Sequence, residues 1–243
     1  MTGDNMISTG IPSTNNPNTK TNIRIKNSII VGLSLSDVKK FKAISPKPSQ
    51  ANVHANALEA EITKRAMNGE LDFEDALIER VKLLKGLSSD IIVNVLKGRI
   101  TLMPGAESLI KTIKRNGSYC ALVSGGFTDF TEAISKMLGF DENRANTLLH
   151  ENEMLSGKVQ LPILGKQAKV DALIDISKKL NCAHDDVIAV GDGANDLGML
   201  TKAGMGVALH AKPIVAAQCK ARLNFSNLEG LLYLQGYSKQ EIL

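Results

Sequence analysis

The spacing of apolar residues between positions 57 and 98 predicts a set of successive helices. One apolar stripe recurs every four residues, as on one face of a helix, before Asn68-Gly69 interrupts it. Its positions are Leu58, Ile62 and Ala66. Asp72 is a suitable cap for a second helix, Gly86 ends that helix, and a third begins near Ser88-Ser89-Asp90. We interpret residues 57–98 as a small helical cap, because so short a segment makes a poor core alone.

From residue 99 to residue 243, short apolar runs alternate with helical patterns. The runs at 119–124 and 187–191 are bounded by glycine, as expected of strands buried on both faces. Residues 147–160 hold two extended runs around Ser156-Gly157, which predicts a hairpin with its turn there. The other expected elements are helices ending near 115 and at about 128–138, 166–180, 195–203 and 213–219, and a strand at 204–209. This alternation predicts an α/β fold whose parallel sheet carries helices on both faces.

The first 56 residues do not follow this alternation. Residues 1–27 are rich in Asn, Thr, Ser, Gly and Pro and have no apolar period, which predicts disorder. Residues 28–36 contain an apolar run that is typical of a strand. Residues 44–56 contain two prolines, and we interpret them as a linker.

Composition narrows the class of protein. The 243 residues are 43% hydrophobic and 22% charged, which suits a globular domain with one sizeable core. The net charge of +4 is scattered and aromatic residues are only 4%, so a solvated surface explains the basic residues better than a nucleic-acid groove. No apolar run is long enough for a membrane span, and no secretory signal is present, so we expect a cytoplasmic protein. Three widely separated cysteines argue against a zinc site or a disulfide framework.

Polar residues follow two of the expected strands. Ser124-Gly125-Gly126 ends the first of these strands, and Asp192 ends the second. Both ends should meet at the carboxyl edge of the sheet, where ligands bind in such folds. Backbone N–H groups at the glycines suit an oxyanion, Asp192 suits Mg²⁺, Asp196 suits a metal-bound water, and Asn195 suits a ligand contact or a loop brace. Alone, the first motif is more often a plain turn, and the second is sometimes a capped turn; their combination favours a site.

A phosphate bound beside two carboxylates needs a compensating cation. Lys169, near the start of the helix before the 187–191 strand, is one candidate. Lys166, Lys178 and Lys179 lie in the same region, and a surface lysine is the alternative interpretation for each. Periodicity does not choose among them.

Several segments resemble one known family. They are "RAMNGELDFEDALIERVKLLKG", "LMPG", "SGGF", "VGDGANDLGML" and "HAKP". In this order and spacing they are similar to the phosphoserine phosphatases of the haloacid dehalogenase superfamily, from about residue 57 onward. The resemblance implies a Rossmann-like core at 99–243, a helical cap at 57–98 and a cytoplasmic, Mg²⁺-dependent hydrolysis of O-phosphoserine, the last step of serine biosynthesis. From the composition we expect no nucleic-acid or membrane partner, and the sequence leaves the oligomeric state open.

The resemblance also implies a role for each candidate residue. In that family an aspartate attacks the phosphoester to form an aspartyl-phosphate, and a second aspartate two residues on is the general acid and base. By this resemblance, Ser124 with Gly125 and the catalytic Lys169 would bind the phosphoryl group. The catalytic Asp192 would bind Mg²⁺, with Asp196 beside it. Asn195 would contact the substrate, and Arg80 would bind its carboxylate.

The first motif of that family, D-x-D-x-[ST], is missing, because no D-x-D occurs in residues 1–60. The usual spacing places its nucleophile near Leu35, followed by Ser36 and Asp37. Residues 28–56 are therefore interpreted as a divergent segment that replaces the first core strand and its motif, through a frame disruption, a fusion or an alternative start. Three functions stay open: an active phosphatase, an inactive phosphate- or phosphoserine-binding remnant, and a non-functional truncated product.

Overall fold

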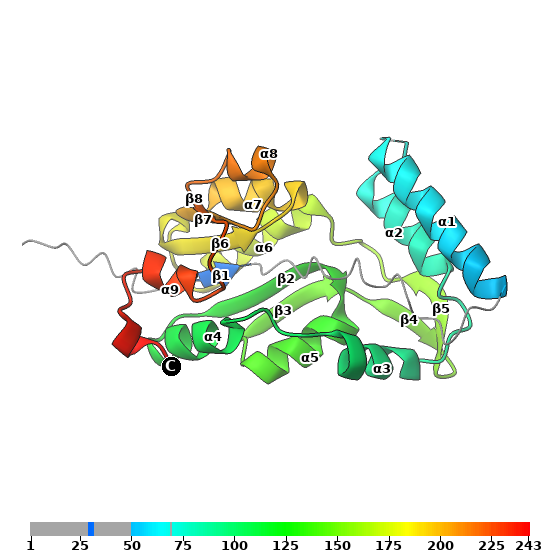
Figure 1. Ribbon diagram of the computed structural model, residues 1–243, viewed down its shortest axis with the longest axis horizontal. Coiled ribbons are helices and arrows are strands. Elements are labelled where there is room, and N and C mark those ends of the chain that lie inside the picture. Colours follow the sequence, from blue (N-terminus) through cyan, green and yellow to red (C-terminus); the bar gives the residue numbers. More distant parts are fainter. Residues whose placement is uncertain (1–28, 32–49, 69) are drawn as a thin grey trace, which may run out of the picture.

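The computed structural model describes residues 29–31, 50–68 and 70–243, and its main feature is a six-stranded parallel sheet. The strand order is β3-β2-β1-β6-β7-β8. The strands are β1 (Ile29–Val31), β2 (Cys120–Phe127), β3 (Glu142–Asn146), β6 (Val187–Gly191), β7 (Met205–Leu209) and β8 (Ala221–Leu223). The sheet and its layers confirm the predicted α/β, Rossmann-like class (Figure 1).

Strand β1 occupies a central place in this sheet. Ile30 lies opposite Cys120 of β2 and Ile188 of β6, in parallel register with both. The strand predicted at 28–36 is therefore present over residues 29–31. Residues 1–27, which were predicted to be disordered, and residues 32–36 lie outside the described residues.

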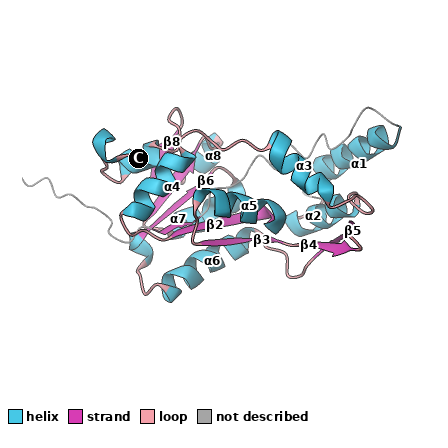
Figure 2. Ribbon diagram, turned by 90° about the horizontal axis from the view of Figure 1, so that it is seen from below, coloured by secondary structure: helices cyan, strands magenta, loops and turns pink. Residues whose placement is uncertain are grey.

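Helices cover both faces of the sheet, as the apolar runs predict (Figure 2). On one face, α4 (Ala106–Arg115), α5 (Thr128–Leu138) and α9 (Gly230–Leu234) pack on alternate residues of β2 and β6. On the other face, α6 (Lys166–Lys179), α7 (Leu197–Lys202) and α8 (Pro213–Ala216) pack on the residues between them. Helix α8 is shorter than the predicted helix at 213–219. Strand β8 and helix α9 were not predicted.

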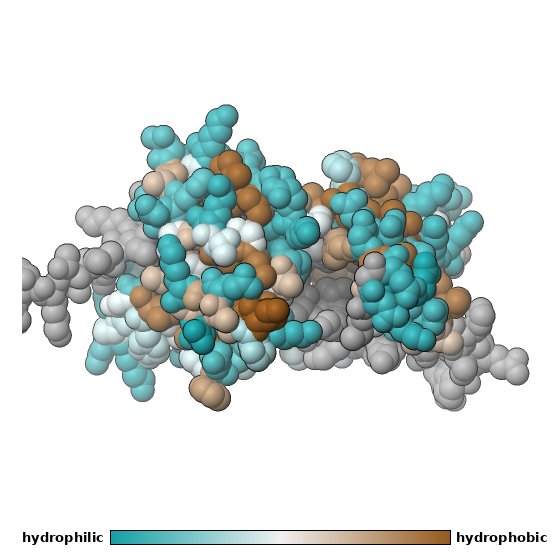
Figure 3. Space-filling view, turned by 90° about the horizontal axis from the view of Figure 1, so that it is seen from above, coloured by the Kyte–Doolittle hydropathy of each residue, from teal (hydrophilic) through white to brown (hydrophobic). Residues whose placement is uncertain are grey.

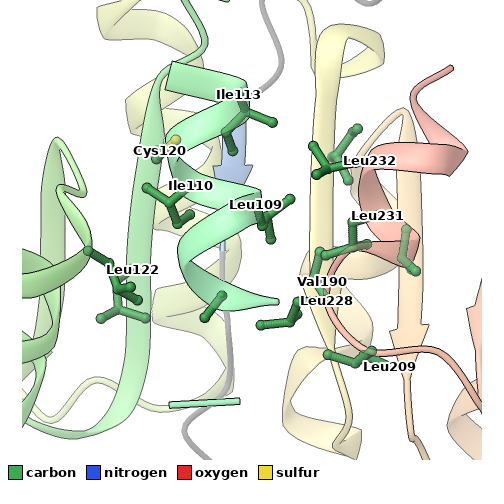
Figure 4. Packing of buried hydrophobic residues seen from close by; sticks show 14 of the residues in the cluster. Leu109, Ile110, Ile113, Cys120, Leu122, Val190, Leu209, Leu228, Leu231 and Leu232 are labelled. Atoms are coloured by element: carbon green, nitrogen blue, oxygen red, sulfur yellow. The ribbon is translucent and has the colours of Figure 1, made fainter. Parts of the chain in front are cut away.

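The first of these faces holds the larger core cluster. Leu109, Ile110 and Ile113 are fully buried and project from α4 into the space between the sheet and α9. Figure 4 shows these side chains with Cys120 and Leu122 of β2 on one side and residues of α9 on the other. This packing covers one face of β2, β6 and β7 with helices.

The predicted cap is built from α1 (Gln50–Met67), α2 (Phe73–Lys82) and α3 (Asp90–Arg99). Asp72 caps α2 as predicted, because its carboxylate accepts a hydrogen bond from the Asp75 N–H at 2.8 Å. Seen from above, the α1–α2 pair forms a lobe beside the lobe that carries the sheet (Figure 3). The linker predicted at 44–56 is wrong from Gln50 onward, because α1 begins there. The domain boundaries at 57–98 and 99–243 stay a prediction.

A hairpin of β4 (Leu148–Glu151) and β5 (Met154–Val159) joins this cap to the core. The predicted turn at Ser156-Gly157 is wrong: the strands reverse at Asn152 and Glu153, which adopt φ of 50° and 62°. The segment after α2 pairs with β5, with Leu155 bonded to Gly86 and Leu87 at 2.8 Å each. The cap therefore completes its apolar cluster with residues of the hairpin and α5.

A polar cluster ties the edge strand β3 to α6. Glu142 accepts hydrogen bonds from the Tyr119 hydroxyl at 2.8 Å, from Lys179 Nζ at 3.0 Å and from Arg144 Nε. Burial alone would raise the pKa of Glu142, but these hydrogen bonds outweigh it and lower the pKa.

Within the described part of the chain, no helix has the length and apolar character that a bilayer crossing requires.

Candidate active site

The carboxyl edge of the sheet brings together most of the residues singled out from the sequence. Ser124 and Gly125 lie near the end of β2, and Asp192 follows β6 directly. These two strands flank β1, so their ends lie about 10 Å apart at the usual spacing of strands. Lys169 reaches the same edge from the first turns of α6.

Lys169 and Asp196 form a buried ion pair at this edge. Their side chains are 3% and 1% exposed, and Lys169 Nζ donates to Asp196 Oδ1. Asp196 Oδ2 accepts the N–H groups of Asp192 at 3.2 Å and Gly193 at 3.0 Å. The pair therefore fixes the loop after β6. Gly191 has no room for a side chain, because a Cβ there would lie 2.6 Å from Asp196 Cβ.

Asp192 differs from Asp196 in its surroundings. Its side chain is half-buried, and its carboxylate makes no hydrogen bond or ion pair with the described residues. Asn195 turns back across the loop, and a Cβ on Gly193 would lie 2.3 Å from its Oδ1. The loop therefore leaves one carboxylate available to a ligand beside a fixed ammonium group.

A divalent ion fits this arrangement in part. Mg²⁺ in phosphate sites takes one or two carboxylates and completes its shell with water and phosphate oxygens. Asp192 supplies one such carboxylate, whereas both oxygens of Asp196 contact protein donors. Among the described residues, no group of three or more His, Cys, Asp or Glu could hold a metal. Asp192 would therefore bind a divalent ion together with substrate oxygens and a further ligand.

The opposite side of the site is formed by residues 124–126, which lie inside β2; the strand end predicted at Ser124 is wrong, because β2 continues to Phe127. Ser124 is 3% exposed, and its Oγ accepts the Gly126 N–H at 3.0 Å. Phe73, the first residue of α2, lies over this stretch of β2. A Cβ on Gly125 would lie 3.0 Å from Phe73 Cζ, and a Cβ on Gly165 would lie 3.6 Å from Phe73 Cδ1. Sequence reasoning missed Phe73; an aromatic residue left 40% exposed in the first turn of a capped helix is the structural signal.

Arg80 lies on helix α2 of the predicted cap and not on the sheet. It lies on α2 about 10 Å beyond Phe73 at the usual helical rise. Its Nη2 donates a hydrogen bond to Thr63 Oγ1 of α1 at 3.1 Å. Contact between Arg80 and a ligand at the sheet edge stays a prediction.

Comparison with known proteins identifies similar chains. A family model of haloacid dehalogenase-like hydrolases matches residues 44–201. The phosphoserine phosphatase of Streptomyces coelicolor is 42% identical over 75% of this chain and 44% of its own length. That of Lactococcus lactis is 43% identical over 70% of this chain and 78% of its own. The unliganded crystal structure of a probable phosphoserine phosphatase from Vibrio cholerae has a TM-score of 0.78 and 32% identity, over 87% of this chain and 65% of the other. The chain spans about half the length of several curated relatives that it matches.

Proposed function

Because the chain belongs to the haloacid dehalogenase-like hydrolases, in their phosphoserine phosphatase family, we propose that it is directed to a small phosphomonoester, O-phosphoserine, and hydrolyses it to serine and phosphate. This reaction is the last step of serine biosynthesis. The observation that supports the proposal best is the buried Lys169–Asp196 pair in the same loop as Asp192, whose carboxylate has no hydrogen bond or ion pair with the described residues.

The residues at the sheet edge suit a phosphoryl group. An ammonium group has three donors, so Lys169 keeps others for phosphoryl oxygens after it bonds Asp196. The Ser124 hydroxyl is oriented by the Gly126 N–H and would donate to the same group. Asp192 would hold a Mg²⁺ ion, whose chemistry when bound is to neutralise and orient the phosphoryl oxygens. Asn195 would contact the substrate, and Arg80 its carboxylate.

The nucleophile is the part of this chemistry that the sequence does not supply. The expected position is Leu35, followed by Ser36 and Asp37, and all three lie outside the described residues. An aspartyl-phosphate needs a carboxylate at this position, and leucine has none. The second candidate function is therefore a protein that binds phosphate or phosphoserine without hydrolysing it. The missing D-x-D favours this second function, and so does the described part of the site, where Asp192 is the one candidate metal-binding carboxylate without a protein partner.

One substitution separates the two functions. Leu35→Asp converts the sequence Leu-Ser-Asp into Asp-Ser-Asp and so restores the D-x-D motif. Phosphate release from phosphoserine with Mg²⁺ would be measured for the wild type and this variant, with calorimetric binding beside it. Leu35→Asn is the matched control, because it has the same size and polarity without the charge. Asp192→Asn removes the proposed metal ligand in either background.

Turnover by the wild type that Asp192→Asn abolishes would support a phosphatase as the chain stands. Binding without turnover, together with turnover gained by Leu35→Asp and not by Leu35→Asn, would support a binding protein that lacks only its nucleophile. A folded wild type that neither binds nor hydrolyses phosphoserine would overturn the proposal.

A further inference from the structure

The side chain of Asn146 bonds to two segments of the candidate site, one at Gly125 and one at Leu164. It is the last residue of β3 and is 2% exposed. Its Nδ2 donates to the Gly125 carbonyl at 3.0 Å and to the Leu164 carbonyl at 3.4 Å. Its Oδ1 accepts the Leu164 N–H at 2.7 Å. One side chain therefore supplies three hydrogen bonds to backbone groups that lie 21 and 18 residues away in sequence.

The two segments lead to the two sides of the site. Gly125 follows Ser124 in the irregular last part of β2, and Leu164 and Gly165 lead directly into α6, which carries Lys169. A Cβ on Gly125 would lie 3.9 Å from the Leu164 carbonyl oxygen. The Gly125 stretch of β2 and the segment before α6 are thus in contact. A shift of either one relative to the other would move the hydroxyl of Ser124 relative to the ammonium of Lys169.

Burial of an amide side chain is unfavourable unless its polar atoms are bonded. Asn146 meets this condition because the register between β2 and β3 shifts between Val123 and Phe127, and its side chain bonds the Gly125 carbonyl inside that irregular stretch as well as both backbone groups of Leu164. An apolar residue at position 146 would remove these bonds from both Leu164 backbone groups and from the Gly125 carbonyl. The geometry of this position therefore serves the two segments and not the core.

From these contacts we infer that Asn146 is a positioning residue, which holds the Ser124–Gly125 stretch of β2 and the start of α6 in the relative placement that binds a phosphoryl group. The inference rests on the proposed function. Asn146 touches no reacting atom; it acts through the backbone of Gly125 and Leu164.

Two variants of Asn146 test this role against matched controls on the same strand. Asn146→Asp is isosteric and keeps the acceptor for Leu164 but loses both donated bonds, and Asn146→Ala loses all three. Asn143 is the control position, because it also lies on β3 and accepts a hydrogen bond from the buried Thr131 hydroxyl at 2.9 Å, away from the site segments. Asn143→Asp and Asn143→Ala therefore match the change in charge and the loss of a side-chain hydrogen bond.

Calorimetry with inorganic phosphate and with phosphoserine, each with Mg²⁺, gives the first readout. We expect Asn146→Asp to weaken binding about tenfold, because misplacement of binding groups reduces affinity and rate steeply, while Asn143→Asp binds as the wild type does. Amide hydrogen exchange gives the second readout. Exchange at Gly126 should become faster in both Asn146 variants and at Leu164 chiefly in Asn146→Ala, with no change in the Asn143 variants.

Equal binding by Asn146→Asp and Asn143→Asp would overturn the inference, whatever their thermal stability. If the wild type binds neither ligand, the proposed function fails, and the exchange data decide the role of Asn146 separately. Unchanged exchange at Gly126 in Asn146→Asp would then overturn the placement role. That isosteric variant also decides the question if Asn146→Ala does not fold.

Discussion

Replacement of Lys169 by methionine tests the buried ion pair directly. Methionine has a similar length and no charge, so the substitution removes the partner of Asp196 Oδ1 and leaves the carboxylate 1% exposed. Loss of one partner from a buried pair destabilises a protein by about 3–5 kcal/mol, because the remaining charge is uncompensated. The two backbone N–H groups on Oδ2 stay in place, so we expect a loss near the lower limit, about 3 kcal/mol.

The assay is urea unfolding followed by circular dichroism, with Asp196→Asn and the double variant measured beside Lys169→Met. The double variant removes both charges, so it should lose much less than the sum of the two single losses. Lys166→Met is the matched control, since Lys166 is the exposed first residue of the same helix, and we expect a change within about 0.5 kcal/mol. A Lys169→Met variant as stable as the Lys166→Met variant would refute the reasoning.

Three further predictions concern the core and the ionisable groups. Leu109→Ala should destabilise the protein by about 3–5 kcal/mol in the same assay, because Leu109 is fully buried and its removal leaves a cavity. Glu142→Gln should lose about 1 kcal/mol at neutral pH. Because the folded-state pKa of Glu142 is lowered, this difference should vanish as the pH of the urea titration falls through that pKa. Burial raises the pKa of Cys120 to about 12, so iodoacetamide should label half-buried Cys182 in the native protein and leave Cys120 unlabelled, as read by peptide mass spectrometry.

The elements that could be predicted from the sequence are those whose buried positions form a local apolar pattern along the chain. Strand β6 is buried at every position, so its apolar run and the glycine that closes it, Gly191, mark its end. Helix α5 has the predicted bounds, Thr128–Leu138, because its stripe faces the sheet along its whole length. The hairpin turn was misplaced because Gly157 was taken as a turn residue. Its positive φ instead serves close packing, since a Cβ there would lie 2.7 Å from Lys85 Cβ.

The candidate site divides in the same way. Ser124 and Asp192 were found because strand ends of a parallel sheet share an edge, which is a rule of topology. Asn146 and Phe73 were missed because their roles depend on contacts across 18 to 52 residues that no local pattern records: Asn146 with Leu164, and Phe73 with Gly125. The start of α1 at Gln50 was missed because the prolines before it dominate the local pattern.

The Lys169–Asp196 pair also bears on whether the chain binds a ligand at all. Burying a charged pair is seldom more stabilising than burying apolar residues of the same volume, so stability alone is a weak reason for its place in the structure. Binding of a ligand anion is a stronger reason, because the pair holds an ammonium group at the edge where the Asp192 carboxylate has no partner among the residues that the structure describes. Loss of a nucleophile removes the chemical step and leaves such ground-state binding in place. The double variant of Lys169→Met with Asp196→Asn should therefore retain most of the stability of the wild type and lose its affinity for phosphate. If calorimetry shows that this stable variant still binds phosphate as the wild type does, the pair is structural and the ligand site lies elsewhere.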